Sequence, residues 1–200
     1  MPANSADPAE LRRELTAVAT RQAGYFTAGQ ALEVGYSYQA QRYHVQRGNW
    51  ERVHRGLFRL PEWPPGDNDT FIFWRLWSGD RAVVSHDSAL TVHDLGDVNP
   101  SRIHLTVPPG FRAREPRLVL HRAALPPGDI EERAGFQVTT VERTVLDLSA
   151  GDLGQEQLDT VLADAFERGL FSPRRLQERA DDHGDRAALR IERALGAVSR

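Results

Sequence analysis

The sequence predicts an α+β protein in which an N-terminal winged helix-turn-helix is followed by a small antiparallel sheet packed with C-terminal helices. Three observations lead to this prediction. Residues 24–60 contain two short helical segments with capping residues, followed by a strand pattern around an Arg-Gly turn. Strand-like segments separated by Pro-Pro-Gly turns occupy residues 102–138. From residue 139 onward, apolar residues recur at the helical period.

Capping residues place the two short helices. Gln30 follows Thr27 by three residues, so the Thr27 hydroxyl and the Gln30 amide can form a reciprocal capping box. Gly35 suits the left-handed conformation that ends a helix, and Ser37 offers the N-cap of the next one. The sequence therefore predicts helices over residues 28–33 and 38–47.

A longer helix is predicted ahead of this pair, because Asp7 offers an N-cap and Pro8 occupies the first helical position. It extends to about Gln22 and completes a three-helix unit. Residues 1–6 are expected to be disordered.

The second short helix carries long side chains with hydrogen-bonding ends. Gln and Arg can read adenine and guanine edges in the major groove through paired hydrogen bonds. Two apolar registers compete on this helix, so its outward face stays open. The registers are Tyr36/Ala40/Tyr43 and Tyr38/Gln41/Val45. We expect contacts to base edges from Gln39, Gln41, Arg42 and Gln46.

The segments at residues 50–54 and 57–60 alternate at the strand period around Arg55-Gly56. Such a tip lets a two-stranded ribbon turn tightly while it projects a guanidinium toward phosphate or the minor groove. We expect Arg55 to enter the minor groove. Phosphate contacts are expected from Ser37, Arg47 and Arg52.

The charge differs in sign between the two parts of the chain. Residues 1–60 contain eight Arg against five acidic residues, whereas residues 61–200 contain 17 Arg against 23 acidic residues. The basic part holds the predicted reading helix, so double-stranded DNA is the predicted partner. A pure protein-interaction module is the alternative, and it predicts no salt-dependent DNA binding.

Composition excludes several classes of chemistry. All 25 basic residues are Arg, so phosphate-binding or catalytic lysines are excluded, and the absence of Cys excludes disulfides and thiolate sites. No apolar run approaches membrane-spanning length, and the N-terminus lacks the pattern of a signal peptide. We expect a cytoplasmic protein with no membrane association.

Prolines and glycine crowd residues 61–67, which neither helix nor strand accepts. The predicted organisation is a DNA-binding domain at residues 1–60, a linker at 61–67 and an α+β domain at 68–200. Within that last domain, an aromatic run at 69–77 predicts a buried helix. Ser85 is expected to cap a helix at 86–95, and three strands are expected at 102–107, 117–122 and 135–138.

The last helix carries a narrow apolar seam that includes Ala188, Ile191 and Leu195. Docking of this seam within the chain and docking on a second chain both stay open. A homodimer is therefore one of the alternatives.

Several groups of residues have side chains of the types used in catalysis or metal binding. Ser85, His86 and Asp87 are neighbours on one helix and fan out by about 100° per residue, so they cannot line up as a catalytic relay. His104 and His121 lie on adjacent predicted strands; a metal site that borrows Asp94 or Asp97 is an alternative to structural histidines. We predict no catalytic residue, no metal and no cofactor. Glu142, Arg143 and Asp147 are expected to form ion pairs or caps.

The runs GYFTAGQALEVGYS and VQRGNWERVHRGLFRL resemble the N-terminal domain of AbiEi-type antitoxins. These antitoxins are the regulator half of type IV toxin–antitoxin systems, which act in abortive phage defence. The phrase TVERTVLDL at residues 140–148 is similar to a segment of the domain that follows in that family. The resemblance implies an antitoxin that represses its own promoter at repeated DNA half-sites and opposes a nucleotidyltransferase-like toxin.

An enzyme is the alternative from a different class, with the second domain a nuclease or phosphotransferase and the winged helix its targeting arm. The absence of Lys and of clustered acidic residues counts against it.

Overall fold

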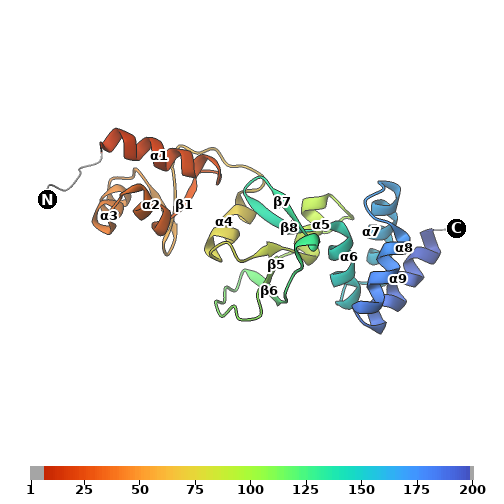
Figure 1. The fold of residues 1–200 in the computed structure, drawn as a ribbon. Helices are drawn as coiled ribbons and strands as arrows, with labels where there is room; N and C mark the ends of the chain where they lie inside the picture. The colour runs from red at the N-terminus through yellow and green to blue at the C-terminus, as the bar shows by residue number, and fades with distance from the viewer. Residues whose placement is uncertain (1–6, 199–200) are drawn as a thin grey trace. The chain divides into compact units, whose positions relative to one another are not determined.

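The computed structural model describes residues 7–198, so the disorder expected for residues 1–6 lies outside the described part of the chain. Its fold divides into two compact units, and each is described by itself. The first comprises residues 1–80 and 134–136, and the second comprises residues 81–133 and 137–200. Figure 1 gives the order of the elements, and the predicted α+β class is confirmed.

Three helices and a small sheet open the first unit. The helices are α1 (Pro8–Thr20), α2 (Ala28–Val34) and α3 (Tyr38–Gln46). The strands are β1 (Tyr25–Thr27), β2 (Glu51–His54) and β3 (Leu57–Arg59), which form an antiparallel sheet in the order β1-β3-β2. This is the predicted winged helix-turn-helix. Asp7 caps α1 as predicted, because its carboxylate accepts from the N–H of Ala9 at 3.0 Å.

The core of this unit is small and aromatic. Phe26 is fully buried, and its ring meets Trp50 edge to face with 4.9 Å between centroids. Trp50 also meets Tyr36 at 5.0 Å. Each large apolar side chain buried here stabilises the fold by about 1.5–3 kcal/mol. These contacts fasten the start of the ribbon to the turn that precedes α3.

The aromatic run forms α4 (Asp69–Trp77) as predicted, and its apolar side chains are buried. Asp69 pairs with Arg59 of β3 at 2.5 Å, and the ring of Phe73 meets that of Tyr25 at 6.0 Å. The proline-rich segment packs closely on the same unit through Trp63. A Cβ on Gly24, whose φ is +81°, would lie 2.4 Å from Cγ of Trp63, so the two residues are in close contact. This unit therefore extends past the predicted linker.

The sheet of the second unit has the strand order β6-β5-β4-β8-β7. Its strands are β4 (Val83–Val84), β5 (Ile103–Val107), β6 (Leu118–Arg122), β7 (Ile130–Arg133) and β8 (Phe136–Thr139). The β4–β5 pair is antiparallel, whereas β5–β6 and β4–β8 are parallel, so the sheet is mixed and the antiparallel pairing expected for the strands at 102–107 and 117–122 is wrong. A loop at residues 108–117 can span about 33 Å when extended, about twice the length of a five-residue strand, so it can return the chain to a parallel start.

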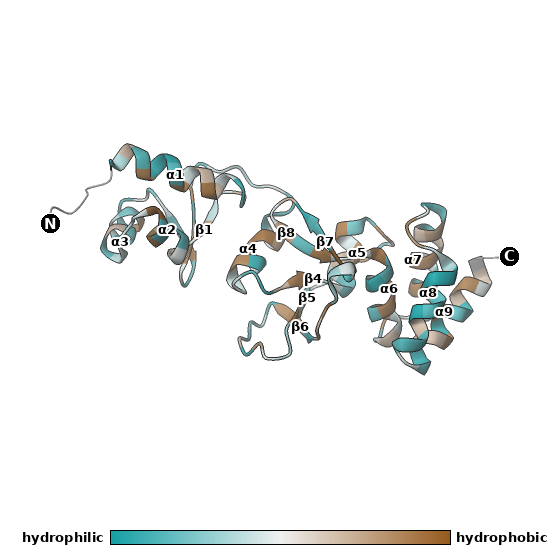
Figure 2. Cartoon of the chain, viewed as in Figure 1, coloured by the Kyte–Doolittle hydropathy of each residue, from teal (hydrophilic) through white to brown (hydrophobic). Residues whose placement is uncertain are grey.

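Helices make up most of the remaining second unit. They are α5 (His86–His93), α6 (Val141–Ala150), α7 (Gln155–Glu167), α8 (Pro173–Asp182) and α9 (Asp185–Val198), and a 3₁₀ turn spans Pro127–Asp129. Figure 2 shows hydrophobic and hydrophilic stretches alternating along the last helices. Leu158, Leu176 and Ile191 are fully buried in one cluster, against which Ala188 and Leu195 pack. The apolar seam of the last helix thus docks within the chain.

The charged residues of TVERTVLDL belong to a buried network. Arg143 is 9% exposed and donates to Asp147 and to Asp129, both at 2.9 Å. Arg179 of α8 donates to the second oxygen of Asp129 at 2.6 Å. The predicted pairing of Arg143 with Asp147 is confirmed, and Asp129 joins it as a second acceptor. The network ties α6 and α8 to the 3₁₀ turn.

Candidate nucleic-acid interface

Local capping sets the start of the helix-turn-helix. The Thr27 hydroxyl accepts from the N–H of Gln30 at 3.1 Å, and the Gln30 amide oxygen accepts from the N–H of Thr27 at 2.9 Å. This is the predicted capping box. Gly35 ends α2 with φ +117°, where an added Cβ would lie 3.0 Å from Leu11. The left-handed turn and the close approach both require glycine at this position.

Ser37 caps the reading helix as predicted. Its hydroxyl oxygen accepts from the N–H of Ala40 at 3.2 Å, and the side chain is exposed. The remaining N–H groups at the start of α3 carry the positive end of the helix dipole, which favours a phosphate. The N-cap role of Ser37 is therefore confirmed, and its contact with a phosphate stays a prediction.

Gln41 lies on the inner face of α3. The prediction that it contacts a base edge is therefore wrong. Gln41 is 3% exposed, and its amide nitrogen donates to the carbonyl oxygens of Ala28 and Tyr36, both at 3.1 Å. A side chain engaged in this way does not reach a base edge. Gln41 was expected to read DNA because it is polar; in the structure its buried amide is instead hydrogen-bonded to two backbone carbonyls of the same unit.

His44 also lies on the inner side of the helix. Its ring stacks on Trp50 with 4.8 Å between centroids, and its Nδ1 lies 3.1 Å from the side-chain nitrogen of Asn49. Burial lowers the pKa of His44 below its ordinary value, and the positive charge of Arg12 lowers it further. A neutral imidazole stacked on Trp50 therefore packs α3 against the residue that precedes β2.

The outer face of α3 keeps the other predicted residues together. Of the two competing registers, neither holds in full: Tyr36 and Gln41 are buried, whereas Tyr38 and Tyr43 are exposed. The predicted residues exposed on α3 and at its end are Gln39, Arg42, Gln46 and Arg47. Gln39, Arg42 and Gln46 follow the spacing i, i+3, i+7, so they lie along one stripe. Val34 to Trp50 contain no acidic residue that would repel a phosphate backbone.

Two aromatic residues of this face were missed by the sequence reasoning. Tyr38 is 70% exposed and Tyr43 is 50% exposed, large values for aromatic side chains. The Arg47 guanidinium lies 5.4 Å from the ring centroid of Tyr43, which holds both side chains on the same side of the helix. The sequence did carry a signal for them. Tyr38 lies four residues before Arg42, and Tyr43 lies four residues after Gln39, so each tyrosine neighbours a predicted DNA-contacting residue on the helix surface.

The ribbon is short. His54 of β2 is paired with Leu57 of β3, and Gly56 in the turn between them has φ +71°. The carbonyl oxygen of Gly56 accepts from the N–H of Ala28 at 2.9 Å, so the tip is tied to the start of α2. Arg55 at that tip is exposed. The guanidinium of Arg52, which is also exposed, lies 5.6 Å from the ring centroid of Phe58.

The groups of serine, histidine and acidic residues with possible chemical roles belong to the second unit. Ser85 starts α5, but its side chain makes no capping bond; its oxygen accepts from the Thr106 hydroxyl at 2.8 Å, so the expected cap is replaced by a buried hydroxyl pair. His104 and His121 do approach, with 3.3 Å between ring nitrogens. The acid beside His104 is Asp87 at 3.6 Å, rather than Asp94 or Asp97. Within the described part of the chain, no three His, Cys, Asp or Glu side chains are grouped to hold one metal ion.

Among the helices that the structure describes, none has the length and apolar character that crossing a membrane requires. No curated protein matches the chain. The fold is similar to the crystal structure of the RV2827C protein from Mycobacterium tuberculosis, with a TM-score of 0.65 and 15% sequence identity. That similarity covers 96% of this chain and 78% of that chain, and at this identity it concerns the fold.

A family comparison identifies the N-terminal segment. The matched model is described as a transcriptional regulator, AbiEi antitoxin, and it covers residues 13–61, from within α1 to the residue after Leu60. The matched segment includes α2, α3 and both strands of the ribbon. Residues 13–61 of this chain therefore match the AbiEi antitoxin family of transcriptional regulators, as the sequence resemblance predicted.

Proposed function

We propose that the chain is a sequence-specific DNA-binding regulator that represses its own promoter and is the antitoxin of a type IV toxin–antitoxin system. One observation carries the DNA-binding part. The outer face of α3 presents Gln39, Arg42 and Gln46 in one exposed stripe, while Gln41 and His44 fix its inner face. A reading helix needs this combination, because its base-contacting side chains must be free and its backbone must be fixed.

The proposed roles follow from position. Gln39, Arg42 and Gln46 contact base edges in the major groove, where Arg pairs with guanine and Gln with adenine. Ser37, Arg47 and Arg52 contact phosphates, which set the register of the helix on the duplex. Arg55 at the ribbon tip enters the adjacent minor groove. The cytoplasmic location belongs to the same proposal, because the promoter lies there.

A single winged-helix module has a small footprint. Such modules bury about 600–1,000 Å² of protein surface on DNA, which limits the affinity of one copy. Repeated half-sites in the promoter, each read by one copy of the chain, overcome this limit. A homodimer on the DNA is one way to meet that requirement.

A gel-shift titration of the full chain tests the DNA-binding part. The probes are its own promoter fragment and a scrambled duplex of equal length, and the variant combines Gln39→Ala, Arg42→Ala and Gln46→Ala. We expect the variant to lose its preference for the promoter and to keep weak binding to both probes. Arg13→Ala is the control, since Arg13 is an exposed arginine on α1. Equal promoter preference in the triple variant and the wild type would remove the assignment.

The antitoxin part rests on the family match and on the resemblance of residues 140–148. The proposed toxin is a nucleotidyltransferase-like enzyme encoded beside this chain. Co-expression tests it: growth arrest caused by the neighbouring gene should be relieved by the wild-type chain. Arrest that persists at equal expression would contradict the antitoxin role and leave DNA binding unaffected.

A further inference from the structure

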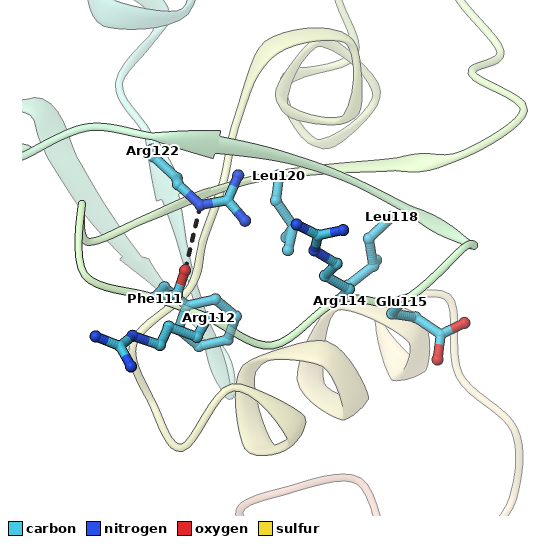
Figure 3. Close-up of a pocket in the computed structure, with 7 residues that line it drawn as sticks. All are labelled: Phe111, Arg112, Arg114, Glu115, Leu118, Leu120 and Arg122. Carbon is cyan, nitrogen blue, oxygen red and sulfur yellow. Dashed lines mark hydrogen bonds between the residues drawn. The ribbon is translucent and has the colours of Figure 1, made fainter.

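A hollow in the second unit is separate from the residues proposed to contact DNA. It lies between the loop that follows β5 and the edge strand β6, and its volume is about 620 Å³. Its walls include Arg112, Arg114 and Arg122, and we call it the arginine hollow (Figure 3). Sites for small molecules typically measure about 300–1,000 Å³, so the volume suits such a ligand.

The loop that forms one wall is anchored. Phe111 is 3% exposed, its N–H donates to the carbonyl of Pro108 at 2.9 Å, and its carbonyl accepts from Nε of Arg122 at 3.2 Å. The guanidinium of Arg81 lies 4.8 Å from the Phe111 ring centroid. Because Phe111 is fixed, the backbone of the adjoining Arg112 is held in place at this wall. Less conformational entropy is then lost when a ligand binds.

Positive charge in the arginine hollow lacks protein counterions. Within residues 7–198, the exposed side chains of Arg112 and Arg114 form no ion pair or hydrogen bond, and Arg122 uses only Nε on Phe111. The one carboxylate in the wall, Glu115, accepts from Nε of Arg117 at 2.9 Å. Figure 3 shows the guanidinium groups of Arg114 and Arg122 turned toward one another beside Leu120. A phosphate matches the forked donors of a guanidinium group, so both side chains suit a phosphate-bearing ligand.

The remaining wall is aliphatic. Leu118 and Leu120 are two residues apart on β6, so their side chains lie on the same face of the edge strand. A flat ring can pack on these side chains while its phosphates reach the arginines, and guanidinium planes also stack on aromatic rings. Leu118 is 5% exposed and Leu120 is half-buried, so a simple phosphate would leave mainly Leu120 uncovered.

We propose that the arginine hollow binds a nucleoside polyphosphate, with its phosphates on Arg114 and Arg122 and its base against Leu118 and Leu120. Arg112 adds positive charge at the opening. This binding is a second activity of the chain and does not depend on DNA binding by α3.

Isothermal titration of the full chain tests the proposal with three probes: ATP, inorganic tripolyphosphate and adenosine. We expect ATP to bind more tightly than tripolyphosphate, and adenosine to bind most weakly. Arg114→Ala should raise the Kd for ATP about ten- to hundredfold, because it removes a charge-assisted hydrogen bond from an exposed side chain that holds no part of the fold. Arg174→Ala is the matched control, since Arg174 is an exposed arginine on α8 whose side chain is 90% accessible. It should leave the Kd unchanged.

Three results would overturn the proposal. The first is an Arg114→Ala chain that binds ATP as the wild type does. The second is tripolyphosphate that binds as tightly as ATP, which would mean that the aliphatic wall takes no part. The third is displacement of ATP by promoter DNA, together with a lower affinity of the Arg114→Ala variant for that DNA. This result would make the hollow a nucleic-acid surface. Failure of the DNA proposal would appear instead as an unchanged promoter preference in the α3 triple variant.

Discussion

The amide of Gln41 on the reading helix donates to the carbonyl oxygen of Ala28 on the preceding helix, at 3.1 Å. The same nitrogen also reaches the carbonyl of Tyr36 in the turn between them. One buried side chain therefore sets the position of α3 relative to α2 and decides which of its faces is free. The face that it frees is the one proposed to enter the major groove.

Gln41→Leu should lower the free energy of unfolding of the first unit by about 1–3 kcal/mol, because the hydrogen bonds from the buried amide to the carbonyls of Ala28 and Tyr36 are lost. Gln39→Leu, on the exposed face of the same helix, should change it by less than about 0.5 kcal/mol. Urea titration followed by tryptophan fluorescence measures this unit alone, since the four tryptophans, at positions 50, 63, 74 and 77, all lie in it. Equal stability of the two variants would show that the Gln41 bonds contribute little.

The elements of the first unit could be predicted from sequence because their signals are local. The capping box at Thr27 and Gln30, the glycine at 35 and the Arg-Gly turn each act over a few residues. The inner face of α3 could not be predicted, because the partners of Gln41 are backbone carbonyls, which carry no sequence signal. Parallel pairing of β5 with β6 was missed for a related reason. A Pro-Pro-Gly sequence indicates that the chain turns after β5. It does not indicate at which end of β5 the loop brings the chain back to begin β6.

Arg42→Ala should lower affinity for the promoter by about 1–3 kcal/mol if this side chain reads a base. Affinity for a scrambled duplex should change much less. The ratio of promoter affinity to scrambled-duplex affinity should therefore fall. Gel-shift titrations of both probes at one salt concentration measure the ratio. A uniform loss on both duplexes would instead make Arg42 a phosphate contact.

Arg55→Ala should weaken binding to every duplex and reduce the slope of log K against log salt by about one. Arg55 at the ribbon tip is exposed, and the proposed contact with the DNA backbone and minor groove would release a counterion on binding. Fluorescence anisotropy over a range of salt concentrations gives this slope. Arg13→Ala, on α1, should leave the slope as in the wild type, and an unchanged slope in Arg55→Ala would place the tip away from DNA.

Asp129→Ala should destabilise the second unit by about 3–5 kcal/mol, because Arg143 and Arg179 would both lose a buried counterion. The matched control is Glu178→Ala, which breaks an exposed pair with Arg174 and should cost less than about 1 kcal/mol. Thermal unfolding followed by far-UV circular dichroism compares them. A loss in Asp129→Ala no larger than in the control would mean that the network contributes little to stability.

Stability of the second unit should fall as the pH decreases from about 6.5. The rings of His86 and His121 stack with 3.4 Å between centroids. Burial is the main cause that lowers the pKa of His86 to about 3, and the charges of His121, His104 and Arg143 lower it further. Burial is also the main cause that lowers the pKa of His121 to about 4, with a smaller effect from His104. Asp87, beside His104, is the carboxylate that faces this cluster.

The direction follows from proton linkage. Below the ordinary value of 6.5, the unfolded chain protonates these two histidines while the folded chain keeps them neutral, so protons favour unfolding. His121→Gln removes one of the two groups and should make the fall shallower, even if the variant is less stable at pH 7. Far-UV melting curves between pH 7.5 and 5 measure the slope, with His54→Gln in the first unit as the control. Parallel curves for His121→Gln and the wild type would contradict the assignment of this pH dependence to the stacked pair.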